Sequence, residues 1–441
     1  MMTVKKIIPL ALLYNLAYTI CPGQNQHPLM TLDNAIAIGL KNNYDILMAK
    51  NQAAVSANDY SFAFGAFLPT INGLASKSWA VNNVNQKFLS GSSINKKNAI
   101  SSNTNLSVNL NWTLFDGLKV FAAAHQLAAI KSEGELDVKN QVNNSVAAII
   151  DAYYNIVQQK QNLLSLQQLM DISRQKLDIA TRQFNVGSGA KLAMLQAEVD
   201  LDSQKSAYLQ QQYMLDQDKS ALNQLIALPA VNTDYDVVDT IPVDLGMGYD
   251  ALKVEIFNNN IPLQVQQKNI DISRYLLQED EAARYPTISF DPSYSYSLSQ
   301  TAAGFALYSQ NRGFTYGFTA TIPIFNQFNN TRLVRDARLN IVYQQLSLSN
   351  QQSQLDLSLQ TAFNNYDYYH KALLLDEQTY SVAQESAQIA LATFQQAQST
   401  LIDVQIAQQS LQAASNKLIA DRYNLKVAET TLLQLRGSLV K

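Results

Sequence analysis

Apolar residues recur at every seventh position over long parts of this chain. The first half contains two such series, Val142, Ile149, Ile156, Leu163, Met170, Leu177, Phe184 and then Met194, Leu201, Tyr208, Leu215, Leu222. The second half contains the matching series Leu359, Tyr366, Leu373, Tyr380, Ala387, Phe394 and Val404, Leu411, Leu418, Leu425, Leu432. A heptad repeat sustained this long is typical of coiled-coil helices that keep one seam against a partner. It predicts paired long helices, since an ordinary helical bundle seldom has runs of this length.

The positions of proline support these long helices. No proline occurs from Thr70 to Leu228, or from Ile324 to the C-terminus. Because proline breaks or kinks a helix interior, such gaps permit very long helices. A continuous helix from Gly117 to Phe184 would be on the order of 100 Å long at about 1.5 Å per residue.

Four other segments alternate between apolar and small polar residues, which predicts β-strands. The residues that would lie on the apolar face of each strand are Ile71, Gly73, Ala75, Lys77 and Trp79; Leu106, Val108, Leu110, Trp112 and Leu114; Ile288, Phe290, Tyr294, Tyr296 and Leu298; and Phe314, Tyr316, Phe318, Ala320, Ile322 and Ile324. Lys77 is the one charged residue among them, and it fits a lipid-facing surface only near the membrane interface. We expect residues 80–103 and 299–312 to form exposed external loops.

Strands of about ten residues with one apolar face and aromatic ends are typical of transmembrane β-barrels. The alternative for each segment alone is a strand of a soluble sandwich. Four strands cannot close a barrel around a lumen, and an open sheet edge is not tolerated in lipid. If these strands lie in a membrane, the chain must therefore associate with other copies.

The chain repeats one plan twice. Phe67-Leu68-Pro69-Thr70-Ile71 recurs as Arg284-Tyr285-Pro286-Thr287-Ile288, and Thr113-Leu114-Phe115-Asp116 recurs as Pro323-Ile324-Phe325-Asn326. We expect a first repeat over 24–230, with strands in about 69–115 and a helical turn at about 185–192. A linker over 231–247 then leads to a second repeat over 248–441, with strands in about 286–325 and a turn at about 395–402.

The N-terminus indicates export. Lys5 and Lys6 precede an apolar run, Ile7 to Ile20, that is shorter than a membrane-spanning helix. We therefore expect residues 1–23 to be a cleaved signal peptide. A lipoprotein signal acylated on Cys21 is the alternative, although Ile20 is bulkier than such signals normally have.

Composition and charge argue against several function classes. The net charge of −3 provides no basic excess for binding nucleic acid. His27, His125 and His370 are far apart in the sequence, and Cys21 is the only cysteine. No catalytic motif, phosphate-binding loop or metal-ligand spacing is present, so we expect neither an enzyme nor a cofactor.

The order of these motifs resembles the TolC-like outer-membrane efflux proteins. The most specific similarities are Gln183-Phe184-Asn185-Val186-Gly187-Ser188-Gly189 with Leu195-Gln196-Ala197, and Phe394-Gln395-Gln396-Ala397 with Leu401-Ile402-Asp403-Val404-Gln405. The resemblance implies an α+β membrane protein in which a long α-helical coiled-coil barrel joins a transmembrane β-barrel, formed on trimerisation from four strands per chain.

The resemblance also implies location and function. It predicts a homotrimer in the outer membrane with a large periplasmic part, docked on a periplasmic adaptor (membrane fusion) protein and an inner-membrane pump. Such a channel passively conducts substrates to the exterior in a tripartite efflux or type I secretion system. The alternative is a periplasmic coiled-coil adaptor or scaffold, which would share the heptads but would not need amphipathic strands.

Particular residues carry these expectations. In the outer membrane, Val108, Leu110, Trp112, Phe290, Tyr294, Tyr296, Phe314, Tyr316 and Phe318 would face lipid. At the periplasmic tip, Asp403 matches the family's entrance aspartate, where three copies in a trimer would attract cations. We expect Gly187 and Gly189 to adopt positive φ in the first turn. Ala397 and Ser399 stand in their places in the second turn, which predicts a different geometry there.

Overall fold

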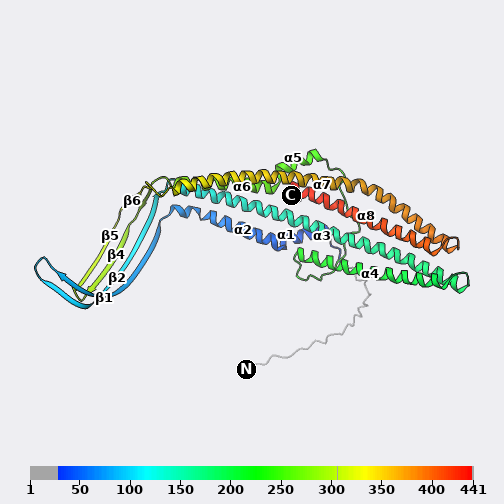
Figure 1. Ribbon diagram of the computed structural model, residues 1–441, viewed down its shortest axis with the longest axis horizontal. Coiled ribbons are helices and arrows are strands. Elements are labelled where there is room, and N and C mark those ends of the chain that lie inside the picture. The colour runs from blue at the N-terminus through cyan, green and yellow to red at the C-terminus, as the bar shows by residue number, and fades with distance from the viewer. Residues whose placement is uncertain (1–27, 305, 440–441) are drawn as a thin grey trace, which may run out of the picture.

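The computed structural model describes residues 28–304 and 306–439. The protein is a long, bent rod with a β-sheet at one end and two helical hairpins at the other (Figure 1). The predicted signal peptide, with Cys21, and also His27 lie outside the described residues.

The same order of elements occurs twice along the chain. The first half contains α1 (Leu32–Asn42), α2 (Tyr44–Ser61), the 3-10 helix η1 (Ala63–Phe67), β1 (Thr70–Lys87), β2 (Ser93–Phe115), α3 (Lys119–Asn185) and α4 (Lys191–Leu225). The second half contains α5 (Tyr249–Asn259), α6 (Ile261–Ala282), β3 (Thr287–Phe290), β4 (Ser293–Thr301), β5 (Tyr308–Thr315), β6 (Phe318–Thr321), α7 (Asn329–Gln395) and α8 (Leu401–Arg436).

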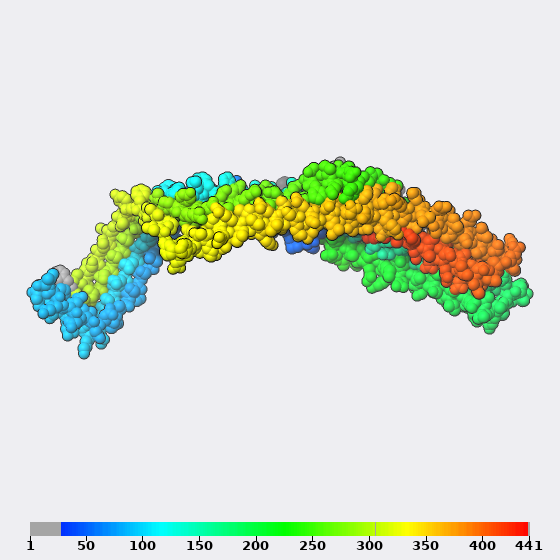
Figure 2. Space-filling model, turned by 45° about the horizontal axis from the view of Figure 1, so that its top comes forward, coloured from blue at the N-terminus to red at the C-terminus, as the bar shows by residue number. Residues whose placement is uncertain are grey.

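The predicted long paired helices are confirmed. Helices α3 and α7 each have 67 residues, and α4 and α8 have 35 and 36. Toward the sheet, α3 packs against α2 and α6, whereas toward the other end it packs against α4 and α8. In Figure 2 the orange α7 and red α8 lie beside the green α4 along the arm that ends in the two helical turns.

Most of the predicted heptad seam is buried. In the second half Leu359, Leu411, Leu425 and Leu432 are almost completely covered. Near the turn of the first hairpin, however, the buried positions of α3 are Leu169, Ser173, Lys176, Ile179 and Ala180, whereas the predicted Met170 and Leu177 are only partly buried. The seam shifts because this part of α3 contacts both α4 and α8, so a single stripe cannot serve both neighbours.

Two asparagines fasten the short helices to the long ones. Asn43 caps α2 by accepting a hydrogen bond from the N–H of Ile46, and its Nδ2 donates to the carbonyl of Leu225 at the end of α4, at 2.8 Å. Asn260 donates in the same way to the carbonyl of Leu435 in α8, at 3.0 Å. Asn43 lies between α1 and α2, and Asn260 lies between α5 and α6. Each side chain therefore links two consecutive short helices to the end of a long helical hairpin.

The segment between α4 and α5 is irregular but well packed. Tyr235 and Val237 are 1% and 2% exposed, and they belong to the core formed with α1 and α3. The N–H of Met30 donates to the carbonyl of Asp236 at 2.8 Å. The predicted linker region thus contributes directly to the hydrophobic core at mid-rod.

The six strands form one antiparallel sheet in which β3 continues into β4 and β5 into β6. The sheet therefore has four ribbons: β1, β2, β3 with β4, and β5 with β6. β1 pairs with β2, the other side of β2 pairs with β3 and β4, and these pair in turn with β6 and β5. Each of the two later ribbons is divided in two, which differs from the four continuous strands expected. One break lies at Asp291-Pro292, where proline lacks the N–H needed for the ladder, and the other at Tyr316-Gly317.

The prediction of long external loops is wrong. β1 and β2 remain paired as far as Lys87 and Ser93, so only residues 88–92 connect them, and β4 and β5 extend to Thr301 and Tyr308. The asparagine and serine in these stretches suggested loops. Both faces of such a ribbon can be polar where neither face is covered, so composition conceals the strand.

Candidate functional site

Two helical turns lie together at the end of the rod farthest from the sheet (Figure 1). The first joins the end of α3 at Asn185 to the start of α4 at Lys191. The second joins the end of α7 at Gln395 to the start of α8 at Leu401. Ile179 and Ala197 of the first hairpin and Phe394 and Val404 of the second belong to one buried cluster, so the two turns are held as a unit.

The two turns have the same geometry, which contradicts the prediction that they differ. Gly187 has φ +76°, and Ala397 at the equivalent position has φ +57°. In each turn this residue donates a hydrogen bond to the carbonyl three residues earlier, Phe184 in one and Phe394 in the other, at 3.0 and 3.1 Å. Ala397 accepts a left-handed conformation that disfavours a side chain, because the surrounding helices impose the reversal.

Gly189 does not adopt the positive φ that we predicted for it. Its role is close approach, because a Cβ there would lie 2.8 Å from the Cβ of Gln183. Ser399, at the equivalent position, places its Oγ 3.0 Å from Oγ1 of Thr393. The second turn is thus held by a side-chain contact that the first turn lacks.

Asp403 lies in the first turn of α8 and closes a capping box with Thr400. The backbone N–H and the hydroxyl of Thr400 both donate to Asp403 Oδ2 at 2.8 Å, and the N–H of Asp403 donates back to Thr400 Oγ1 at 3.3 Å. These hydrogen bonds lower the pKa of the Asp403 carboxyl group, so it is charged at neutral pH. The motif Thr400-Leu401-Ile402-Asp403 is a capping signal that can be recognised in the sequence itself.

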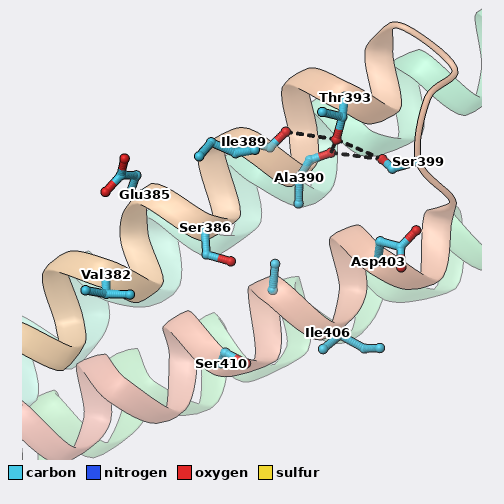
Figure 3. Close-up of a pocket in the computed structure, with 11 residues that line it drawn as sticks. Val382, Glu385, Ser386, Ile389, Ala390, Thr393, Ser399, Asp403, Ile406 and Ser410 are labelled. Carbon is cyan, nitrogen blue, oxygen red and sulfur yellow. Dashed lines mark hydrogen bonds between the residues drawn. The ribbon is translucent and has the colours of Figure 1, made fainter.

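A groove between α7 and α8 runs back from this turn (Figure 3). It has a volume of ≈ 520 Å³ and carries two carboxylates, Glu385 on α7 and Asp403 on α8. The rest of its lining is apolar or small and hydroxylated: Val382, Ser386, Ile389, Ala390, Thr393, Ser399, Ile406, Ala407 and Ser410. The first α8 turn therefore presents its charge beside an open, mainly apolar groove.

A buried polar network joins three helices above the turns. Lys176 of α3 is completely buried, and its Nζ lies 2.7 Å from Asp200 Oδ2 of α4 and 3.3 Å from Gln408 Oε1 of α8. Nε2 of Gln408 donates to Ser173 Oγ of α3 at 2.7 Å. The sequence alone does not predict this network, because a lysine beside a heptad seam is normally exposed.

At the opposite end, strand pairing brings the predicted lipid-facing residues onto one side of the sheet. Directly paired residues point to the same face, and Val108 pairs with Tyr294, which pairs with Phe314. In the same way Leu106 pairs with Tyr296, Ile71 with Leu110, and Trp112 with Phe290, which pairs with Phe318. Tyr316 lies between β5 and β6, with its ring 5.7 Å from that of Phe314.

The opposite face is made of small polar residues. Asn105, Ser107 and Asn109 of β2 pair there with Ser297, Ser295 and Ser293 of β4. The two faces of the sheet thus differ sharply in polarity, although both are largely open to solvent in the single chain. This is the arrangement of a sheet between an apolar medium and a water-filled lumen.

No helix within 28–304 or 306–439 is both long and apolar enough to cross a membrane. Over the same ranges, no group of three or more histidine, cysteine, aspartate or glutamate side chains is placed to hold a metal ion.

The chain is similar to known proteins in both sequence and fold. The chain is 25% identical over 358 residues to the outer membrane protein TolC of Escherichia coli K12, covering 78% of this chain and 71% of that protein. It is 20% identical over 417 residues to the outer membrane efflux protein BepC of Brucella suis, covering 93% and 86%. Its fold is similar to that of the outer membrane protein VceC of Vibrio cholerae, with a TM-score of 0.75 at 15% identity over 92% of this chain and 96% of that one.

The family match covers both halves of the chain. Residues 36–228 and 253–438 each match the outer membrane efflux protein family, and the gap between them spans the irregular segment after α4 and the first turn of α5. The protein therefore belongs to the outer membrane efflux protein family.

Proposed function

We propose that three copies of this outer-membrane channel protein close into one β-barrel continued by one helical tunnel. As a family member, the chain acts in an efflux or type I secretion system. The proposal adds the number of copies, the position of the entrance and the place where a partner docks.

The observation that carries the proposal is a two-faced sheet with two unpaired edges. In the described part of the chain, β1 pairs only with β2, while β5 and β6 pair only with β4 and β3. Unpaired backbone groups cannot be left in hydrocarbon, so both edges need strands from other copies. Four ribbons are too few to enclose a lumen, whereas three copies supply about twelve, enough for a barrel with an open interior.

The helical end supports a tunnel that narrows at the turns. Many apolar side chains remain exposed on the long helices of the single chain, including Leu339, Leu346, Leu357 and Leu374 on α7. Heptad-bearing helices with uncovered apolar faces are suited to pack against neighbouring copies. We place the entrance at the tip, where Asp403 of each copy would contribute one carboxylate to a ring.

The tip is also the surface that we assign to a periplasmic adaptor protein. The groove between α7 and α8 is open, and its apolar lining suits the apolar face of a partner helix. The rival function, a soluble periplasmic adaptor or scaffold, gives no reason for the matched row of Val108, Tyr294 and Phe314 at the other end of the rod.

Fractionation and channel recording together test the proposal. The expressed protein should be found in the outer-membrane fraction and run as a heat-labile trimer that resists SDS at room temperature. Purified protein added to a planar lipid bilayer should then produce ion-conducting steps of uniform size. Recovery as a soluble periplasmic monomer, or a membrane-bound protein without conductance, would contradict the proposed trimeric channel.

A further inference from the structure

Charge is unevenly distributed between the sheet and the helices. Residues 60–115 and 292–328 contain no aspartate or glutamate, but they contain Lys77, Lys87, Lys96, Lys97 and Arg312. The chain as a whole is acidic, with a net charge of −3. The part of the sheet formed by β1, β2, β4, β5 and β6 therefore carries only positive charges, although the protein as a whole is acidic.

Lys77 and Arg312 lie on the aromatic face of the sheet. Arg312 pairs with Tyr296, which pairs with Leu106, which pairs with Ala75. The next row on the same face contains Lys77, Thr104, Leu298 and Gln310. The two basic residues thus occupy neighbouring rows on the two outer strands, β1 and β5.

The row beyond Lys77 marks a membrane interface. It contains Trp79, Ser102, Gln300 and Tyr308, and tryptophan and tyrosine are the residues enriched where lipid meets water. At the other end of the face, Trp112 pairs with Phe290. On β2 the distance from Ser102 to Trp112 is about 34 Å at ~3.4 Å per residue, or ~26 Å in height for strands tilted by ~40°. This is close to the ~25 Å apolar band of such barrels.

Neither basic residue is neutralised by the chain itself. Lys77 Nζ lies 5.2 Å from the centre of the Trp79 ring. In the described residues neither Lys77 nor Arg312 forms an ion pair, and both side chains are exposed. A cation on a lipid-facing surface is tolerated at the interface, where phosphate groups can approach it, and arginine binds phosphate with two parallel hydrogen bonds.

We propose that Lys77 and Arg312 bind the phosphate groups of a lipid in the external leaflet of the outer membrane. The inference rests on the proposed barrel, because it requires the aromatic face to contact lipid. Closing the barrel joins the free β1 edge of one copy to the free β5 edge of the next. Lys77 and Arg312 would then alternate around the trimer. Lys77 would lie one row and Arg312 two rows inside the Trp79 and Tyr308 level, about 5 and 10 Å in height, so each long side chain must extend toward the interface to reach phosphate.

The test compares two lipids that differ only in phosphate. Full-length trimer in detergent is titrated with diphosphoryl lipid A and with the same glycolipid after enzymatic dephosphorylation, and bound lipid is counted by native mass spectrometry. The wild-type protein should bind the phosphorylated lipid at least about tenfold more tightly, because each basic residue near an anionic headgroup contributes about fivefold. Equal binding of the two lipids would overturn the proposal without any variant.

Charge variants locate the site. Lys77→Gln and Arg312→Gln should each weaken binding of the phosphorylated lipid by about fivefold, and the double variant by about twentyfold or more. Lys87→Gln removes one charge at the end of the hairpin and is the matched control, which should remain within about twofold of wild type. Losses as large in Lys87→Gln as in Lys77→Gln would overturn the assigned site.

A separate readout distinguishes this inference from the proposed channel. If the trimer forms and conducts but shows no preference for the phosphorylated lipid, only the lipid site is wrong. If no trimer forms, the proposed channel itself fails. Lys77→Arg and Arg312→Lys should retain lipid binding, which separates the charge from the shape of each side chain.

Discussion

Lys176 and Asp200 form a buried ion pair, with 2.7 Å between Nζ and Oδ2, that ties α3 to α4 above the tip. Gln408 joins this pair from α8, so the network links the first helical hairpin to the second. The cluster of Ile179, Ala197, Phe394 and Val404 lies between the network and the turns. We therefore expect the network to fix how the two hairpins are aligned with each other.

Replacing Lys176 by methionine should destabilise the protein by about 2–4 kcal/mol, because Asp200 and Gln408 would lose a buried donor. Lys205→Met is the matched control, since Lys205 pairs with Asp202 at the surface, and it should change stability by less than about 1 kcal/mol. Chemical unfolding of the purified protein measures both. Similar small changes in the two variants would mean that the buried pair does not hold the hairpins together.

Ala397→Gly should stabilise the second turn by about 1 kcal/mol, because glycine adopts the observed positive φ without strain. The reciprocal change, Gly187→Ala, should destabilise the first turn by about 1 kcal/mol. Thermal unfolding of the purified protein gives both shifts, which should be opposite in sign. A destabilised Ala397→Gly variant would show that the methyl group contributes more by packing than it loses by strain.

The comparison of these turns shows where sequence reasoning succeeds. The long helices and the places where they reverse could be predicted, because heptads and missing prolines act over many residues. The geometry of the second turn could not, because the αL conformation of Ala397 is imposed by the packed helices on both sides rather than by its own preference. Local propensity is a weak guide where tertiary packing decides.

The sheet gives a second comparison. Alternation correctly assigned Val108, Tyr294 and Phe314 to one face, since strand period and pairing are both local rules. The length of the β1–β2 ribbon could not be predicted, because its polar residues carry no apolar period. The buried position of Lys176 was also missed, since it depends on Asp200 and Gln408 arriving from distant parts of the chain.

The proposed lipid-facing rows predict a depth-dependent effect of charge. Val108 lies in a row between the Trp112 and Ser102 levels, so Val108→Arg should cost about 2–4 kcal/mol of barrel stability. Phe318 pairs with Phe290 in the row of Trp112, at the edge of the band, so Phe318→Arg should cost only about 0–1 kcal/mol.

Ser107→Arg is the control for these two variants, because it places the same side chain on the polar face. It should assemble nearly as well as wild type. The measurement is the fraction of protein that forms SDS-resistant trimers after refolding into lipid vesicles. Equal yields for arginine at Val108 and at Ser107 would contradict the assignment of the lipid-facing side.

Asp151 on α3 predicts a pH dependence of stability. Its Oδ1 is buried without a hydrogen-bond partner in the described residues, and burial raises the pKa of its carboxyl group from 3.8 to about 6. A raised carboxyl pKa means that the folded protein binds the proton more tightly than the unfolded chain. Stability from this group is therefore present below about pH 4 and is lost as the pH rises to about 6.

Asp151→Asn should remove that loss. At pH 7.5 the variant should be more stable than wild type by about 1–2 kcal/mol, a figure reduced from the full shift because the side chain is partly open to solvent. At pH 3.5 the two proteins should unfold at similar denaturant concentrations. The expectation fails if the difference between wild type and variant is the same at both pH values.

The last prediction concerns the entrance. In the single chain the carboxylate of Asp403 is held by Thr400 and is charged at neutral pH, and the residue stands at the first turn of α8 beside the open groove. Three such charges around one axis would favour cations in the pore. Asp403→Asn removes the charge, while its amide oxygen can still accept a hydrogen bond from the N–H of Thr400.

This variant should therefore assemble normally but lose cation selectivity. In planar bilayers with a tenfold salt gradient, its reversal potential should move toward zero, and block by multivalent cations applied from the tip side should weaken. Glu385→Gln is the matched control, because Glu385 lines the same groove on α7 rather than at the first turn of α8. If Glu385→Gln shifts the reversal potential and Asp403→Asn does not, the selective ring lies on α7, and Asp403 serves the protein only as the cap of α8.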